Sequence, residues 1–180
     1  MWSPTWTLWG NSVKGARSGM ALCGTIALLG IAVPAFARDS LGLYQTWGAF
    51  RDAAVPRCYA IAMAEPSTKQ RDYQPFVSVG TWPRRALRNQ VHFRLSRKLA
   101  ANARIVLAIG DQRFELVGGG GDAWPADARA NAAIVAAMRS ARSMTVSARG
   151  ESGGGFSNTW PLPGAASAMD AAAIGCARAR

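Results

Sequence analysis

The segment QVHFRLS, residues 90–96, alternates strictly between polar and apolar side chains. In an extended chain Val91, Phe93 and Leu95 point to one side, and the polar residues between them point to the other. This alternation predicts a strand with one buried face and one face in water. A half-buried strand is typical of antiparallel sheets, so we expect its partner strands in neighbouring segments of the chain.

Six further segments have the apolar pattern of strands, and turn residues separate them. Their ranges are 57–63, 75–82, 105–109, 112–117, 143–149 and 156–162. The fourth follows the third after a Gly110-Asp111 turn, and the last two flank a glycine-rich tip, so each pair predicts a hairpin. The run Gly118–Gly121 is interpreted as a loop that breaks the sheet.

Two helices are predicted in the C-terminal half. From about 126 to 142 the apolar period becomes helical, with Asp127 near the start and Arg139 near the end, each at the terminus that its charge suits. A shorter helix is predicted over 165–173. Strands outnumber helices and do not alternate with them, so we predict a mainly β fold. It is an antiparallel sandwich or a flattened barrel with one longer and one short C-terminal helix.

The N-terminal segment has the order of a secretory signal. Lys14 and Arg17 precede an apolar run, 20–33, which Ala35-Phe36-Ala37 follows. The run is shorter than the roughly 20 residues of a membrane-spanning helix, so we predict cleavage after Ala37 and no transmembrane span in the mature chain. An uncleaved anchor is the alternative. Residues 38–180 then form a single exported domain, periplasmic or secreted.

The charge of the predicted domain favours anionic partners. Residues 38–180 hold 19 basic residues against 10 acidic ones, a formal charge of +9. Anionic lipid, lipopolysaccharide phosphate, acidic glycan and nucleic acid all respond to such a field, but an exported protein rarely meets nucleic acid. The other interpretation is that arginine serves only as a surface solubiliser. Charge alone does not decide between them.

Cysteine usage predicts a covalent link. Loss of residues 1–37 removes Cys23 and leaves Cys58 and Cys176, an even number in an oxidising compartment. We predict that they form a disulfide. The bond would close a loop of 118 positions, from 58 to 176. In the chain-entropy model, closing a loop of this length stabilises the fold by about 4–5 kcal/mol. Two separate buried thiols are the alternative.

Few residues suggest catalysis. The chain holds one histidine, His92, and neither an HExxH nor a CxxC motif. No cofactor or metal site is predicted. An enzyme would need His92 beside a carboxylate such as Asp52 or Asp111, within hydrogen-bond reach in a shared cleft.

Basic residues cluster on either side of the predicted strand 90–96, and with Arg104 they could share one surface. As an anion-binding surface they would grip a headgroup or sugar phosphate, and otherwise they are a solvated sheet edge that prevents aggregation. The candidate anion-binding residues are Arg84, Arg85, Arg88, Arg94, Arg97 and Lys98. The tryptophans Trp47, Trp82, Trp124 and Trp160 either cap the core or form a sugar-stacking surface.

Three short motifs resemble one known family. They are Trp47-Gly48-Ala49-Phe50, Arg57-Cys58-Tyr59 and Leu162-Pro163-Gly164, the last followed by Ala168 and Cys176. With the export signal and the arginine-rich middle, they resemble the invasion-associated locus B family of small exported alphaproteobacterial envelope proteins. Typical members carry additional cysteines that this chain lacks, so the family's disulfide pattern transfers only in part.

The resemblance implies an immunoglobulin-like β-sandwich without an established enzymatic activity. We therefore expect a non-enzymatic periplasmic or envelope protein that binds an anionic envelope component or a protein partner. The expected partners are anionic lipid, lipopolysaccharide or an envelope protein, and not nucleic acid. A small periplasmic hydrolase using His92 with a carboxylate is the alternative.

Overall fold

A computed structural model describes residues 38–177 of the chain. The predicted signal segment, residues 1–37, lies outside the described residues. Within them the chain forms ten strands, two α-helices and one short 3-10 helix. The strands are β1 (Asp39–Tyr44), β2 (Trp47–Asp52), β3 (Arg57–Met63), β4 (Phe76–Trp82), β5 (Leu87–Arg94), β6 (Ile105–Ile109), β7 (Gln112–Gly119), β8 (Asp122–Pro125), β9 (Ser143–Arg149) and β10 (Gly155–Pro161). The helices are η1 (Pro83–Arg85), α1 (Ala128–Met138) and α2 (Ala165–Ala177).

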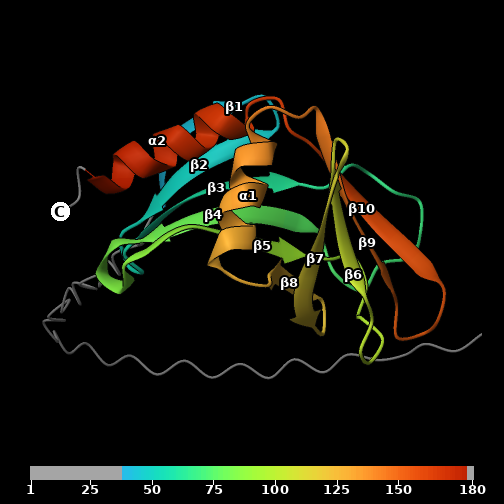
Figure 1. Cartoon of the computed structure of the whole chain (residues 1–180). Coiled ribbons are helices and arrows are strands. Elements are labelled where there is room, and N and C mark those ends of the chain that lie inside the picture. The colour runs from blue at the N-terminus through green and yellow to red at the C-terminus, as the bar shows by residue number, and fades with distance from the viewer. Residues whose placement is uncertain (1–37, 178–180) are drawn as a thin grey trace, which may run out of the picture. The chain divides into compact units, whose positions relative to one another are not determined.

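All ten strands belong to one antiparallel sheet, in the order β1-β2-β3-β4-β5-β8-β7-β6-β9-β10. The sheet is strongly bent, so that its two halves face each other (Figure 1). Hydrogen bonds join these halves: the Glu65 amide donates to the Thr159 carbonyl at 2.8 Å, and Trp47 Nε1 donates to the Pro161 carbonyl at 2.9 Å. The predicted mainly β, antiparallel fold is confirmed, and the bend is consistent with a sandwich.

Alternating side chains fill the space inside the bend. Val91, Phe93 and Leu95 are fully buried, as their alternation predicted, and the Phe93 ring lies 5.6 Å from that of Trp160. Helix α1 packs on β5, β6 and β8, whereas α2 packs on β1 to β4. Each helix therefore covers a different part of the sheet (Figure 1).

Three strands were not predicted. β1 and β2 lack the clean alternation of β5, and β1 is an edge strand with a register shift between Ser40 and Gly42. The interpretation of Gly118–Gly121 as a break in the sheet is wrong. β7 continues to Gly119, the chain turns at Gly120 (φ +61°), and β8 pairs back from Asp122. Glycine is needed for that positive φ, so the run makes a hairpin.

The helix lengths also differ from the predicted ones. The carboxylate of Asp127 accepts the Ala130 amide at 2.7 Å and sets the start of α1, which ends eleven residues later at Met138. α2 has thirteen residues, so it is the longer helix. Gly164 (φ +91°) lets the chain turn against the Tyr44 backbone just before the helix begins. The last turn of the helix contains Cys176.

The tryptophans divide between the two interpretations. Trp47 and Trp160 are fully buried in the core. Trp82 is half-buried, and Trp124 is 38% exposed on the outer face of the sheet. The core interpretation therefore holds for the first two.

Candidate functional site

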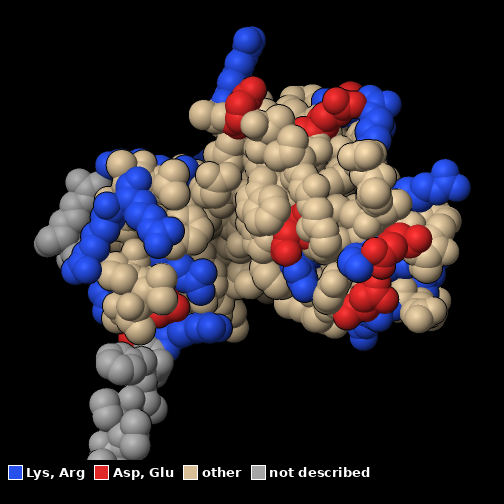
Figure 2. Space-filling model, turned by 90° about the horizontal axis from the view of Figure 1, so that it is seen from below, with Lys and Arg blue, Asp and Glu red and all other residues tan. Residues whose placement is uncertain are grey.

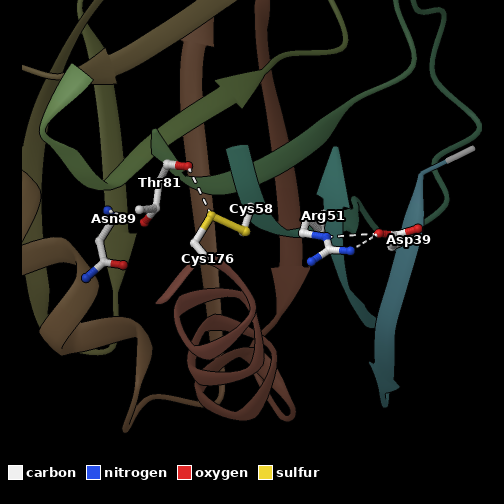
Figure 3. The surroundings of a disulfide bond; sticks show 6 residues. All are labelled: Asp39, Arg51, Cys58, Thr81, Asn89 and Cys176. Atoms are coloured by element: carbon white, nitrogen blue, oxygen red, sulfur yellow. Dashed lines mark hydrogen bonds and ion pairs between the residues drawn. A yellow bond between two sulfur atoms is a disulfide. The ribbon is translucent and has the colours of Figure 1, made fainter. Parts of the chain in front are cut away.

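The predicted disulfide is confirmed. Cys58 of β3 is fully buried, and its Cα lies 5.6 Å from that of Cys176 in the last turn of α2. The Cys176 sulfur also lies 3.9 Å from the Thr81 carbonyl oxygen of β4 (Figure 3). This is a contact and not a hydrogen bond, because a bridged sulfur carries no hydrogen. The bond fastens the end of α2 to the strands beneath it.

A cleft of about 910 Å³ opens beside the disulfide. Its walls come from three elements: the β2–β3 connection, the β4–β5 hairpin and the end of α2. We call this the basic cleft. Small apolar side chains and the two sulfurs line much of it, and four arginines line the rest. The arginines are Arg51, Arg57, Arg84 and Arg88.

Two of these arginines form ion pairs with nearby carboxylates. Arg51 donates to Asp39 Oδ2 from Nε at 2.9 Å and from Nη2 at 2.5 Å (Figure 3). Arg57 Nη2 lies 3.5 Å from Asp52 Oδ2, and its guanidinium lies 4.7 Å from the centre of the Tyr59 ring. The Arg57 Nε atom is buried and has no hydrogen-bond partner among residues 38–177.

The β4–β5 hairpin carries the other two cleft arginines, and Arg85 beside them. Its backbone has positive φ at Ala86 (+54°) and Asn89 (+50°). Asn131 of α1 holds the hairpin backbone at Asn89 and Val91. Its Nδ2 donates to the Asn89 carbonyl, and its Oδ1 accepts the Val91 amide, both at 2.9 Å. The hairpin is thus tied to the helix.

Arg84, Arg85 and Arg88 are exposed and form no ion pair with any residue that the structure describes. In Figure 2 basic side chains gather with little acidic surface at the end of the molecule that carries this hairpin. At the opposite end, basic and acidic side chains are interleaved. These three arginines are therefore available to an anion from outside.

The other half of the predicted anion-binding set lies elsewhere. Arg88 and Arg94 are at opposite ends of β5, about 20 Å apart at 3.3 Å per residue. Arg94 Nη1 lies 2.5 Å from Asp122 Oδ2, and Lys98 Nζ lies 2.7 Å from Glu151 Oε1. Arg97 donates to the Ser152 hydroxyl. The structure thus brings Arg84, Arg85 and Arg88 together, and it gives the other three partners within the chain.

Arg51 and Arg57 were missed as cleft residues. Arg51 lies opposite Cys58 in the β2–β3 register, which places it beside the disulfide. The sequence signal was the arginine next to a bridged cysteine, Arg57-Cys58. Without β2, which was not predicted, this signal could not be extended to Arg51.

His92 has a carboxylate partner, but not one of the two predicted. Its Nε2 lies 2.9 Å from Asp122 Oδ1, on β8. Asp52 lies in the basic cleft, and Asp111 lies in the β6–β7 turn. The pairing with Asp52 or Asp111 is therefore wrong, because β8, the strand that supplies the partner, was interpreted as loop.

The His92–Asp122 pair lies on the open outer face of the sheet. The imidazole stacks on Trp124 with ring centres 5.1 Å apart. Ser78 of β4 is directly opposite His92 in register, yet no hydrogen bond joins the two side chains. Neither His92 nor Asp122 lines the basic cleft. The pair and the basic cleft are therefore separate features of the molecule.

Residues 38–177 contain neither a candidate metal cluster nor a helix that could span a membrane. No group of three His, Cys, Asp or Glu side chains in this part of the chain is placed to hold a metal ion. None of its helices has the length and apolarity to cross a bilayer.

Comparisons with protein-family models, curated proteins and solved structures gave no match for this chain. The likeness to the invasion-associated locus B family therefore stands on the residues quoted for it.

Proposed function

We propose that this chain is a non-enzymatic, exported envelope protein of the invasion-associated locus B type, and that its basic cleft binds an anionic component of the envelope. The observation that carries the proposal is the set of three exposed arginines, Arg84, Arg85 and Arg88, beside a cleft of about 910 Å³. The disulfide supports an oxidising compartment, periplasmic or extracellular, because such bonds are rare in the cytosol.

The chemistry of the cleft favours an oxyanion. Guanidinium groups bind phosphate and carboxylate through paired N–H donors, and charge-assisted bonds of this kind are about twice as strong as neutral ones. The cleft walls exclude part of the solvent, which strengthens the attraction relative to an open surface.

The apolar lining indicates what else the ligand carries. Ala53, Pro56, Pro83 and Ala173 contribute carbon surface to the cleft alongside the arginines. A bare inorganic anion would leave this surface in water, whereas an amphipathic phosphate would cover it. The volume of the cleft is that of a small-molecule site, so a lipid or glycolipid headgroup fits better than a nucleic-acid strand.

The proposal is tested with dihexanoyl phosphatidate below its micelle concentration, a soluble amphipathic phosphate, titrated into the protein by calorimetry. We expect binding that weakens with salt and falls at least about tenfold when Arg84, Arg85 and Arg88 are all changed to Gln, since exposed charges are screened. The matched control changes Arg113 of β7, Arg149 of β9 and Arg142 just before β9 to Gln, which removes the same charge from exposed positions that do not line the cleft. Equal binding by both variants would leave the cleft arginines without a role.

A hydrolase is the second candidate, and the observation that favours it is the His92–Asp122 pair. Such a pair can take a proton from a bound hydroxyl or water. Hydrolysis of a chromogenic ester by the purified protein that is lost on His92→Gln, but not on Arg88→Gln, would favour the enzyme.

A further inference from the structure

Three large apolar side chains are exposed at the end that holds the basic cleft. Val55 is 50% exposed, Leu87 42% and Ile174 53%. Each is flanked in sequence by residues that line the cleft: Val55 by Pro56, Leu87 by Ala86 and Arg88, and Ile174 by Ala173. All three are therefore next to cleft residues in the chain, and none of them lines the cleft itself.

These side chains come from three separate elements. Val55 is in the turn between β2 and β3, Leu87 begins β5 after the η1 hairpin, and Ile174 is near the C-terminal end of α2. The β4–β5 hairpin and the end of α2 lie at the same end of the bent sheet (Figure 1). The other large exposed apolar residues are on strands away from this end. They are Leu43, Met63, Val117 and Trp124.

The charge around these apolar side chains has one sign in excess. Five arginines lie at this end: Arg51, Arg57, Arg84, Arg85 and Arg88. Only two of them are paired with carboxylates, those of Asp39 and Asp52. Apolar side chains that project among unpaired cations are the combination that binds an anionic membrane surface.

We propose that this end of the molecule docks on the surface of an anionic phospholipid bilayer, with Val55, Leu87 and Ile174 entering the interface and the cleft arginines on headgroup phosphates. This rests on the anion-binding function proposed for the cleft, and it names the partner. Neither contribution suffices alone, because one short apolar anchor gives only marginal membrane binding and a second signal is needed. Here the two signals are interleaved on the same hairpin, where Leu87 lies between Arg85 and Arg88.

The docked orientation follows from the same residues. Val55 is in a turn, Leu87 is the first residue of β5 and Ile174 is at a helix end, so they can enter the headgroup region with only the end of the sheet near the lipid. The Asn131 hydrogen bonds and the disulfide hold two of the three elements in place, so little conformational freedom is lost on docking.

The test is co-sedimentation of residues 38–180 with phosphatidylglycerol/phosphatidylcholine vesicles and with pure phosphatidylcholine vesicles. We expect partition onto the anionic vesicles only, weakened at least about tenfold by V55S/L87S/I174S, since each side chain loses its apolar contact with the interface. The control L43S/M63S/V117S removes three exposed apolar side chains elsewhere and should partition as the wild type does. All six positions are exposed, and far-UV circular dichroism checks that each variant is folded.

The outcomes separate this inference from the function on which it rests. Wild-type partition by V55S/L87S/I174S, or equal partition onto neutral vesicles, would overturn the docking. If that variant still binds dihexanoyl phosphatidate as tightly as the wild type, the anion site stands by itself. If the wild-type protein does not bind dihexanoyl phosphatidate, the anion site is overturned. Retention on lipopolysaccharide micelles but on neither vesicle would also reject the bilayer as partner.

Discussion

The two ends of β5 carry similar numbers of basic residues in different surroundings. Near its start, Arg84, Arg85 and Arg88 are exposed beside a cleft and have no acidic partner among the described residues. At its end, Arg94 is held between the Asp122 carboxylate and the Tyr73 ring, whose centre lies 3.8 Å from the guanidinium carbon. The first group is open to solvent, whereas the second is part of the fold.

The difference shows that a basic residue's role depends on which acidic groups the topology brings to it. β8 pairs with the far end of β5 and supplies Asp122. No strand pairs with the near end on that side, because the β5–β8 register extends only over Phe93 and Arg94. At the cleft the near end meets α2 instead, whose lining residues are Ala173, Cys176 and Ala177.

The disulfide should give the largest difference between the two ends. It fastens α2 to β3 at the cleft end, whereas the far end is held by non-covalent contacts. Reductant, or C58A/C176A, should lower the free energy of unfolding by about 4–5 kcal/mol in the chain-entropy model and the melting midpoint by roughly 10 °C. Thermal unfolding followed by circular dichroism measures this.

The double variant is its own control, because reductant should not move its midpoint further. If the melting midpoint of the wild-type protein does not change on reduction, the disulfide does not stabilise the cleft end. The anion affinity of the same samples shows whether the arginines depend on that bond.

Single arginine substitutions should separate the two ends next. Arg94→Gln removes an ion pair whose side chains are only 28% and 27% exposed and also a cation–π contact, so we expect a loss of about 1 kcal/mol in unfolding free energy. Arg88→Gln should leave that free energy within about 0.5 kcal/mol, because the side chain is exposed and unpaired. Chemical denaturation of both variants measures the contrast. Equal losses would contradict the division of the basic residues into structural and available groups.

Much of the sheet could be predicted because apolar and polar side chains alternate along its half-buried strands. β3, β6 and β9 were predicted with the observed bounds, and Val91 and Phe93 were placed in the core. β8 could not be predicted in the same way, since it has four residues and follows a glycine run that is typical of loops. The hydrogen bonds of the sheet, and not its own side chains, make it a strand.

The site was harder to predict than the fold. Counting cysteines was enough for the Cys58–Cys176 bond, because two sulfurs remained. The cleft needed the β2–β3 register, which places Arg51 opposite Cys58, and the bend of the sheet, which no local pattern specifies. The separation of Arg88 from Arg94 was implied by the predicted strand itself, but the missed β8 hid the partner that makes Arg94 structural.

The smallest expected effect on stability comes from the ion pair between Arg139 and Asp170, which joins α1 to α2. Arg139, at the end of α1, donates to Asp170 of α2, with Nη2 at 2.5 Å from Oδ1. This hydrogen bond, helped by the charge of Arg139, lowers the pKa of Asp170 below its ordinary value, although partial burial opposes the shift. The ionised carboxylate therefore stabilises the fold above the pKa of the unfolded chain, about 3.9, and this contribution is lost as the pH falls through the lower folded pKa.

Asp170→Asn removes this contribution and with it the pH dependence. Both side chains are about half exposed, so the loss at pH 7 should be below about 1 kcal/mol in unfolding free energy. The gap between wild type and variant should narrow as the pH falls below about 4 and through the lower folded pKa, because the wild-type carboxyl then takes up its proton. Urea denaturation at several pH values measures it, and Arg139→Gln should show the same closing gap. A gap that stays constant over this range would mean that the ion pair does not join the two helices energetically.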